Sequence, residues 1–169
     1  MKEPKKSPKA GEIHLDRFEV RMLDHLQRSG RMPTTELAAA VGLSATPCAR
    51  RLEAMMESGV IEGFGARLDR RKIGLSVEVF VLVRLISHSD QSPDRFVTKV
   101  EAMEPVIACW ALTGDHDFML QAVLPDVEAL NRFIAEDLMR IEGVRDVRTN
   151  LVLRNIKGPG PLPLSHLAE

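Results

Sequence analysis

Side chains suited to contacting nucleic acid occur close together between residues 44 and 51. They are the hydroxyl groups of Ser44 and Thr46 and the guanidinium groups of Arg50 and Arg51, with Pro47 between them. Hydroxyl and guanidinium groups donate hydrogen bonds to base edges and phosphates, and the N-terminal end of a helix favours phosphate. The segment therefore suits the first turns of a helix that reads DNA. The alternative is an ordinary helix pair with solvated arginines.

A second group of polar side chains lies in the run Thr113, Gly114, Asp115, His116 and Asp117. A metal site is disfavoured because adjacent residues of an extended chain point in alternate directions. Acid–base catalysis is disfavoured because no nucleophile or cofactor motif lies nearby. A simple tight turn and a ligand site both remain open. In a ligand site, a carboxylate would bind an ammonium group and backbone N–H groups near the glycine would bind a carboxylate.

Motifs of common enzyme classes are absent from the sequence. It contains no G-x-x-x-x-G-K-[ST], no G-x-G-x-x-G and no G-x-S-x-G segment. Cys48 and Cys109 are too few for a disulfide scaffold or a four-ligand metal site, so we predict that both are small buried residues. We predict no enzymatic activity, no catalytic residues, no metal site and no cofactor.

The composition indicates a folded protein. Of the 169 residues, 44% are hydrophobic and 28% are charged, values typical of a globular protein with a core. No run approaches the roughly 20 apolar residues of a membrane helix, and the lysine-rich start lacks the apolar stretch of a signal peptide. We expect a cytoplasmic protein without a membrane partner.

The charges are distributed unevenly along the chain. Residues 1–74 hold 14 Lys and Arg against 10 Asp and Glu, whereas residues 75–169 hold 9 against 14, which gives net charges of +4 and −5. Such asymmetry is expected when one half of a protein meets a polyanion. Four of the basic residues belong to the lysine-rich start, so a solvated tail accounts for part of the difference.

The spacing of apolar residues predicts three helices in the basic half. Asp16 can cap the first and Ser44 the third. The expected starts and ends are Asp16 to Gly30, Pro33 to Gly42 and Ser44 to Gly59. Two helices joined by a sharp turn at Gly42 form a helix-turn-helix. The residues from Val60 to Leu68 then predict a short strand or wing.

The remainder alternates between strand and helix patterns. Strands are predicted over 77–85, 106–112, 117–124 and 144–153, and helices over 93–103 and 127–138. This βαββαβ order predicts a ferredoxin-like sandwich in which two helices cover one face of a four-stranded antiparallel sheet. Because the strands are mostly apolar, we expect another copy of the chain to cover the other face. The fold class is therefore α+β, and residues 157–169 predict an extended tail.

Residues 15–154 together resemble the leucine-responsive regulatory protein/AsnC family, also called feast/famine regulators. Two stretches, one around Thr46, Pro47 and Cys48 and one from Thr113 to Phe118, are specific in combination. Further matching stretches are residues 15–19, 26–31, 36–44 and 58–61. The sequence departs from the family at Glu19, where the family has a second aspartate, and this change keeps the charge.

The resemblance implies a winged helix-turn-helix joined to an αβ sandwich that senses a small effector, commonly an amino acid. It implies a transcriptional regulator that binds double-stranded DNA through Ser44, Thr46, Pro47, Arg50 and Arg51. It also implies homodimers and higher homo-oligomers, such as tetramers or octamers. A DNA-binding protein of this kind would be associated with the nucleoid.

The effector site implied by the resemblance is the turn from Thr113 to Asp117, completed by Arg148, Thr149 and Leu151 of a neighbouring chain. The implied domain plan follows the composition shifts along the chain. It comprises an arm at 1–13, a helix-turn-helix domain at 14–60, a wing or linker strand at 61–75, a sandwich at 76–156 and a tail at 157–169.

Overall fold

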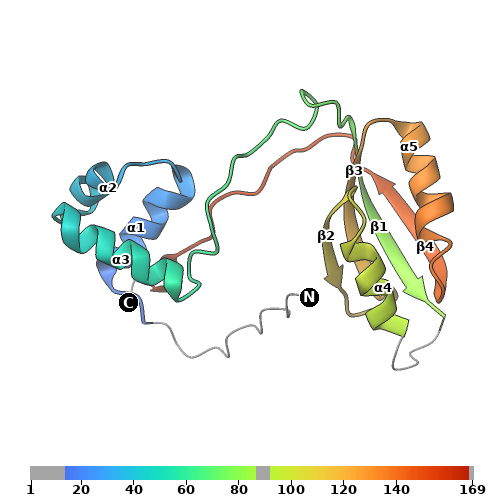
Figure 1. Ribbon diagram of the computed structural model, residues 1–169, viewed down its shortest axis with the longest axis horizontal. Coiled ribbons are helices and arrows are strands. Elements are labelled where there is room, and N and C mark those ends of the chain that lie inside the picture. The colour runs from blue at the N-terminus through green and yellow to red at the C-terminus, as the bar shows by residue number, and fades with distance from the viewer. Residues whose placement is uncertain (1–13, 87–91, 168–169) are drawn as a thin grey trace. The chain divides into compact units, whose positions relative to one another are not determined.

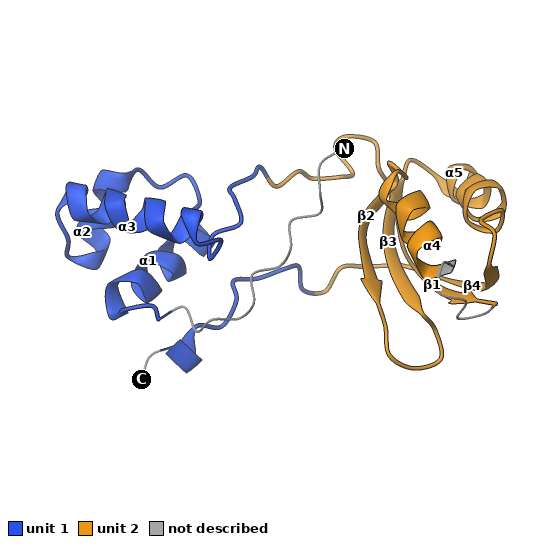
Figure 2. Ribbon diagram, turned by 60° about the horizontal axis from the view of Figure 1, so that its bottom comes forward, with its two compact units in different colours: residues 1–66, 157–169 blue, residues 67–156 orange. Residues whose placement is uncertain are grey.

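The computed structural model describes residues 14–86 and 92–167. The arm predicted at 1–13 lies outside this part of the chain. The structure divides into two compact units (Figure 2). Of the described residues, 14–66 and 157–167 belong to a helical unit, and 67–86 and 92–156 belong to a sandwich unit.

The helical unit contains three helices, α1 (Arg17–Arg28), α2 (Thr34–Val41) and α3 (Ala45–Glu57), shown in Figure 1. Their apolar faces meet in one core, whose buried members are Met22, Leu23, Leu26, Leu37, Ala38, Val41, Cys48 and Met55. The three predicted helices are thus confirmed. The apolar face of each helix is buried against the other two.

The turn between α2 and α3 depends on Gly42. This residue has φ of +77°, a left-handed conformation that glycine adopts without strain. Its N–H and that of Leu43 bond back to carbonyl groups of α2. Arg21 of α1 donates to the carbonyl oxygens of Val41 and Ala40 at 3.2 and 2.8 Å. The end of α2 is therefore fixed both by the turn and by α1.

The segment from Val60 to Leu68 differs from the prediction of a short strand or wing. No strand is assigned to these residues in the structure. Val60 and Ile61 pack against the helical core, and the Ile61 N–H donates to the Met55 carbonyl at 3.0 Å. A strand requires a partner for its backbone groups, and no described segment of this chain pairs with these residues. The expected strand is therefore not formed within one chain.

The sandwich unit has the predicted βαββαβ order. Its elements are β1 (Val77–Leu85), α4 (Ser92–Glu101), β2 (Val106–Ala111), β3 (Phe118–Leu124), α5 (Val127–Arg132) and β4 (Val144–Leu151). The strands lie in the order β2-β3-β1-β4, with every neighbouring pair antiparallel. Both helices cover the same face of the sheet (Figure 1). The prediction of a ferredoxin-like sandwich is confirmed.

Burial alternates residue by residue along the central strand β1. Val79, Val81 and Val83 face the helices and are fully buried, together with Phe96 of α4. The second predicted helix is interrupted, because α5 continues as a π-helix over Phe133–Leu138. The buried core of this unit therefore lies between the helices and one face of the sheet.

The C-terminal segment folds back onto the helical unit. The Gln27 side-chain amide donates to the Leu162 carbonyl at 3.2 Å, and the Leu162 N–H donates to Gln27 Oε1 at 2.5 Å. Leu164 packs against the helical core, and Ser165–Leu167 form one turn of 3-10 helix. The tail is extended as predicted up to this turn, but its packing on α1 was not predicted.

Two remaining expectations have different outcomes. Within the described residues, no helix is both long and apolar enough to cross a membrane. Cys48 is buried as predicted, but Cys109 is exposed. The prediction for Cys109 is wrong because β2 is an edge strand of the sheet, where one side of the strand has no neighbour.

Candidate DNA-binding surface and ligand-binding turn

The first half of α3 presents an exposed polar surface. Ser44, Thr46 and Arg50 are exposed, and Pro47 is half-buried. Thr46 and Arg50 are four residues apart, and a helix turns by about 100° per residue, so their side chains share one face. Cys48 points into the core. The hydroxyl groups of Ser44 and Thr46 and the guanidinium group of Arg50 therefore lie on the solvent side of this helix.

The two ends of α3 differ in charge. Ser44 occupies the N-cap position, but its hydroxyl makes no capping hydrogen bond, contrary to the expectation from sequence. The first turn thus retains backbone N–H groups that can bind an anion. Glu53 and Glu57 are exposed in the second half of the helix. The N-terminal end of α3 is accordingly the end better suited to an anion such as phosphate.

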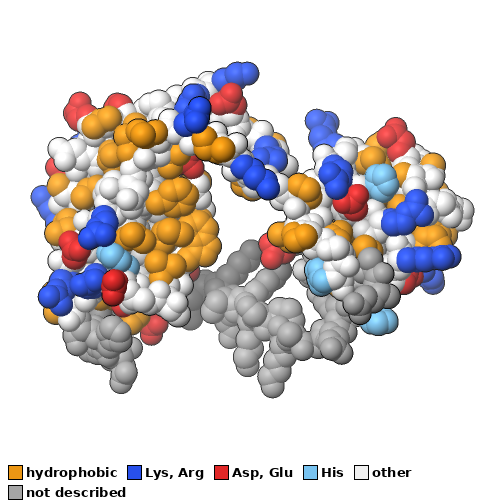
Figure 3. Space-filling view, turned by 180° about the vertical axis from the view of Figure 1, so that it is seen from behind, with side chains coloured by type: hydrophobic (Ala, Val, Ile, Leu, Met, Phe, Trp, Pro, Cys, Tyr) orange, Lys and Arg blue, Asp and Glu red, His pale blue; other side chains and the backbone are white. Residues whose placement is uncertain are grey.

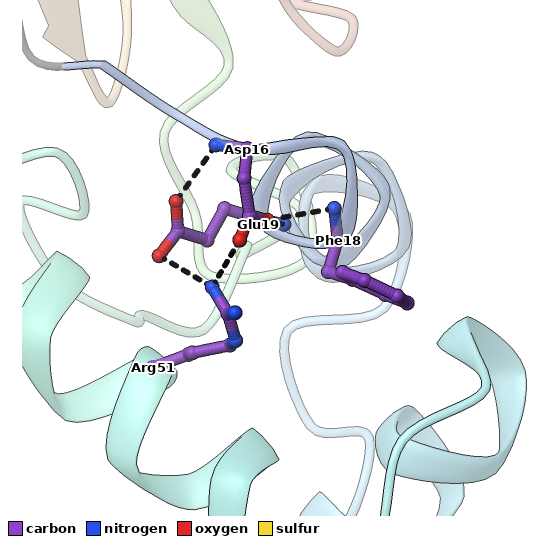
Figure 4. Close-up of polar contacts among 4 residues, drawn as sticks. All are labelled: Asp16, Phe18, Glu19 and Arg51. Carbon is purple, nitrogen blue, oxygen red and sulfur yellow. Dashed lines mark hydrogen bonds and ion pairs between the residues drawn. The ribbon is translucent and has the colours of Figure 1, made fainter.

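Arg51 has a different environment from Arg50. Its side chain is 27% exposed, and Nη1 contacts Asp16 Oδ2 at 2.5 Å and Glu19 Oε1 at 3.1 Å (Figure 4). The guanidinium carbon lies 5.8 Å from the centre of the Phe18 ring. The helix rotation that places Arg50 outward turns Arg51 toward the start of α1.

The two carboxylates that bind Arg51 also cap α1. The Phe18 and Glu19 N–H groups donate to Asp16 Oδ1 at 2.8 and 3.0 Å, and the Asp16 N–H donates to Glu19 Oε2 at 2.9 Å. This reciprocal arrangement is a capping box. Each carboxylate therefore uses one oxygen for the cap and the other for Arg51.

The pKa of Asp16 reflects these contacts. Burial acts to raise it, but the backbone hydrogen bonds from Glu19 and Phe18, with the bond and charge of Arg51, hold the pKa of Asp16 below its usual value. Hydrogen bonds to the ionised form and a nearby positive charge both favour the carboxylate. Asp16 therefore remains charged at neutral pH.

The residues from Thr113 to Asp117 form the turn between β2 and β3. The Leu112 N–H donates to the Asp117 carbonyl at 2.8 Å, which closes the turn. Gly114 has φ of +115°, a conformation that side chains rarely permit. The turn thus needs glycine at this position.

Contacts with β1 hold this turn in place. Asp117 Oδ2 accepts from the Leu85 N–H at 2.7 Å, and the Asp117 N–H donates to the Val83 carbonyl at 2.9 Å. Arg84 Nε donates to the Asp115 carbonyl at 2.7 Å. These bonds fix the backbone of the turn relative to the sheet.

The polar side chains of the turn differ in availability. Asp115 and Thr113 are exposed, whereas Asp117 is half-buried and its carboxylate is engaged with the backbone of β1. His116 Nε2 is buried and has no hydrogen-bond partner among the described residues. Asp115 is therefore the carboxylate better placed to receive a ligand's ammonium group.

The three residues predicted on β4 do not lie together. Arg148 pairs with Leu82 and occupies the face of the sheet that no helix covers, diagonally across from Arg84. Thr149 and Leu151 pair with helix-facing valines of β1 and so lie on the opposite face. Within one chain, only Arg148 shares a face with Arg84, whose side chain contacts the turn.

The face of the sheet without helices carries a broad apolar surface (Figure 3). Alternation and register place Phe80 and Leu82 of β1 on it, beside Met119 of β3 and Trp110 of β2. Trp110 is 42% exposed. We call these four residues the open sheet face.

Sequence reasoning missed several residues of these sites. Arg84 was a detectable signal, since it is the only basic residue of the mostly apolar strand β1. Asp16 and Glu19 have the spacing of a capping box, yet nothing in the sequence pairs them with Arg51. No group of three or more His, Cys, Asp and Glu side chains within the described ranges could hold a metal ion.

Together, the helix-turn-helix with an exposed polar first turn on α3 and the α/β sandwich with its rigid turn define a class, that of DNA-binding regulators with a ligand-binding domain. The family models agree with this division. Residues 15–62 match a winged helix-turn-helix DNA-binding model, and residues 78–162 match the Lrp/AsnC ligand binding domain.

Similar proteins cover nearly the whole chain. The leucine-responsive regulatory protein of Escherichia coli K12 is 35% identical over 85% of this chain and 87% of its own length. The protein of the same name from Rhizobium meliloti is 35% identical over 86% and 93%. The chain belongs to the Lrp/AsnC family of transcriptional regulators, which are not enzymes.

Solved structures show the same fold. A Neisseria meningitidis transcriptional regulator in complex with L-methionine has a TM-score of 0.87 and 34% identity, covering 90% of this chain and 99% of its own. An AsnC family regulator from Agrobacterium tumefaciens has a TM-score of 0.84 and 37% identity, with the same coverage.

Proposed function

We propose that the chain binds double-stranded DNA through the exposed face of α3, with Ser44, Thr46, Pro47 and Arg50 at the DNA. The observation that carries this proposal is the shared outward face of Thr46 and Arg50 at the N-terminal end of the helix. The first turns of a recognition helix enter the major groove, where an arginine reads guanine or binds phosphate. Arg51, which was also predicted at the DNA, is bonded to Asp16 and Glu19.

The test compares two arginine variants in a mobility-shift assay on operator DNA. Arg50→Ala should weaken binding by about tenfold, since one arginine contact supplies about 1–3 kcal/mol. Arg132→Ala, which removes the same charge from the exposed end of α5, is the matched control and should bind normally. Equal affinity of the Arg50 variant and the wild type would contradict the proposed surface.

We also propose an amino acid as the effector, bound at the turn from Thr113 to Asp117. The exposed Asp115 carboxylate suits the ammonium group, and backbone N–H groups at Gly114 suit the carboxylate. The methionine complex of the Neisseria regulator supports this chemical class. Arg148, Thr149 and Leu151 would have to come from a neighbouring chain to complete the site.

The effector proposal is tested by thermal unfolding of the purified protein with each of the twenty amino acids. A ligand at 100 times its Kd stabilises the folded state by about 2.7 kcal/mol. Asp115→Asn should remove the shift while leaving DNA affinity intact, and the exposed Glu104→Gln should retain the shift. An undiminished shift in the Asp115 variant would exclude this site.

The protein would act in the cytoplasm, at the nucleoid, as a homodimer or a higher homo-oligomer. The open sheet face supports self-association, since apolar surface of this extent is rarely left in water. A neighbouring chain is also what the proposed effector site requires.

A further inference from the structure

We propose that Arg51 is a positioning residue, which sets the orientation of α3 for DNA binding through Asp16 and Glu19 rather than by touching DNA. This inference deepens the proposed role of α3 and rests on it. It reverses the ordinary expectation that an arginine in the first half of a recognition helix contacts nucleic acid.

The guanidinium group of Arg51 is already occupied by other partners. Nη1 lies within 3.1 Å of two carboxylates, and the group lies beside the Phe18 ring. To reach a phosphate, Arg51 would have to leave both carboxylates. Two negative charges would then remain uncompensated near the DNA, which opposes binding.

The two carboxylates that bind Arg51 are themselves held in place. Asp16 and Glu19 are fixed by the capping box at the start of α1, and Glu19 is only 18% exposed. Arg51 is therefore attached to a backbone element through two short side chains. An ion pair between fixed groups loses less side-chain entropy than one between mobile groups on the surface.

The direction of Arg51 is linked to that of Arg50 by helix geometry. Arg51 and Arg50 are adjacent in α3, so they point about 100° apart. Holding Arg51 against the start of α1 fixes the rotation of α3 about its own axis. This rotation determines whether Thr46 and Arg50 face outward, so the network controls the DNA-binding face without belonging to it.

Removing one charge distinguishes a positioning role of Arg51 from a purely electrostatic effect, because the two predict opposite changes in DNA affinity. Glu19→Gln keeps a side-chain oxygen for the capping box but removes one of the two negative charges that bind Arg51. On electrostatics alone, loss of a negative charge should strengthen DNA binding. The positioning role predicts weaker binding instead, by about three- to tenfold.

Glu36→Gln is the matched control, because it removes the same charge from the exposed first turn of α2. It should bind DNA as well as the wild type or better. Circular dichroism at the assay temperature should show all variants folded, so that a change in affinity reports orientation.

The double variant completes the test. If Arg51 acts through Glu19, then Glu19→Gln in an Arg51→Ala background causes no further loss, although each change alone weakens binding. Additive effects of the two changes would overturn the positioning role, and so would tighter DNA binding by the Glu19→Gln variant alone. In either case, weaker binding by the Arg50→Ala variant would still support α3 as the DNA-binding helix. If Arg50→Ala is also silent, both proposals fail.

Discussion

At the scale of single residues, identical side chains have different environments because of their direction. Arg50 and Arg51 have the same chemistry, but one is exposed and the other is bonded to Asp16 and Glu19. Asp115 and Asp117 form a similar contrast, since only the second is tied to the backbone of β1. Residue type alone therefore identifies a region of function but does not assign the roles within it.

The lowered pKa of Asp16 predicts a specific dependence on pH. A carboxylate whose pKa is lowered in the folded state stabilises that state at pH values above the ordinary pKa. This stabilisation is lost as the pH falls through the lowered pKa. The Asp16→Asn variant keeps a capping group but loses the charge, so the Tm of the variant at pH 7 should be about 1–4 °C below that of the wild type. Thermal unfolding by circular dichroism at pH 7 and pH 3 checks this prediction. A deficit of the same size at pH 3 would contradict it.

At the scale of elements, the helical unit is built from two distant parts of the sequence. The C-terminal segment contributes Leu164 to the helical core and two backbone bonds at Leu162 to Gln27 of α1. A carboxamide suits this role because it both donates and accepts. The tail therefore belongs to the structure of the DNA-binding unit.

Removing the tail should destabilise the helical unit. A chain ending at Ile156 loses both hydrogen bonds and the Leu164 contact, which together contribute about 1–3 kcal/mol. Hydrogen exchange of the α1 amides in the otherwise complete protein should be faster by the corresponding factor. A chain ending at Leu167 keeps all of these contacts and is the control. Unchanged exchange in the shorter chain would show that the tail adds no stability.

At the scale of the whole molecule, the sandwich is inserted in the chain between two parts of the helical unit. The four residues of the open sheet face are apolar and have no covering layer among the described residues. The other face of the sheet is covered by α4 and α5. Apolar side chains on the second face of a sheet favour a second covering layer. A second copy of the chain supplies the missing layer in the proposed assembly.

Leu82→Asp tests this assembly. The side chain lies on the open sheet face, so a charge there should leave the single chain folded but should disrupt a dimer formed through this face. Light scattering after size exclusion should show a smaller species at equal concentration. Val127→Asp, at a 65% exposed position on α5, should leave the mass unchanged. An oligomer that survives the Leu82 change must form through another surface.

The sequence by itself determined the helices, the strand order and the family, because these depend on local periodicity, capping and turn residues. The stop at Gly42, the cap at Asp16 and the alternation along β1 are all properties of neighbouring residues. The tertiary structure decided which groups meet across long separations. The contacts of Arg51 with Asp16, of Gln27 with Leu162 and of Arg84 with Asp115 join residues 31 to 135 positions apart. The exposure of Cys109 and the absence of a strand after Val60 also depend on tertiary neighbours. Burial and strand pairing both require a partner.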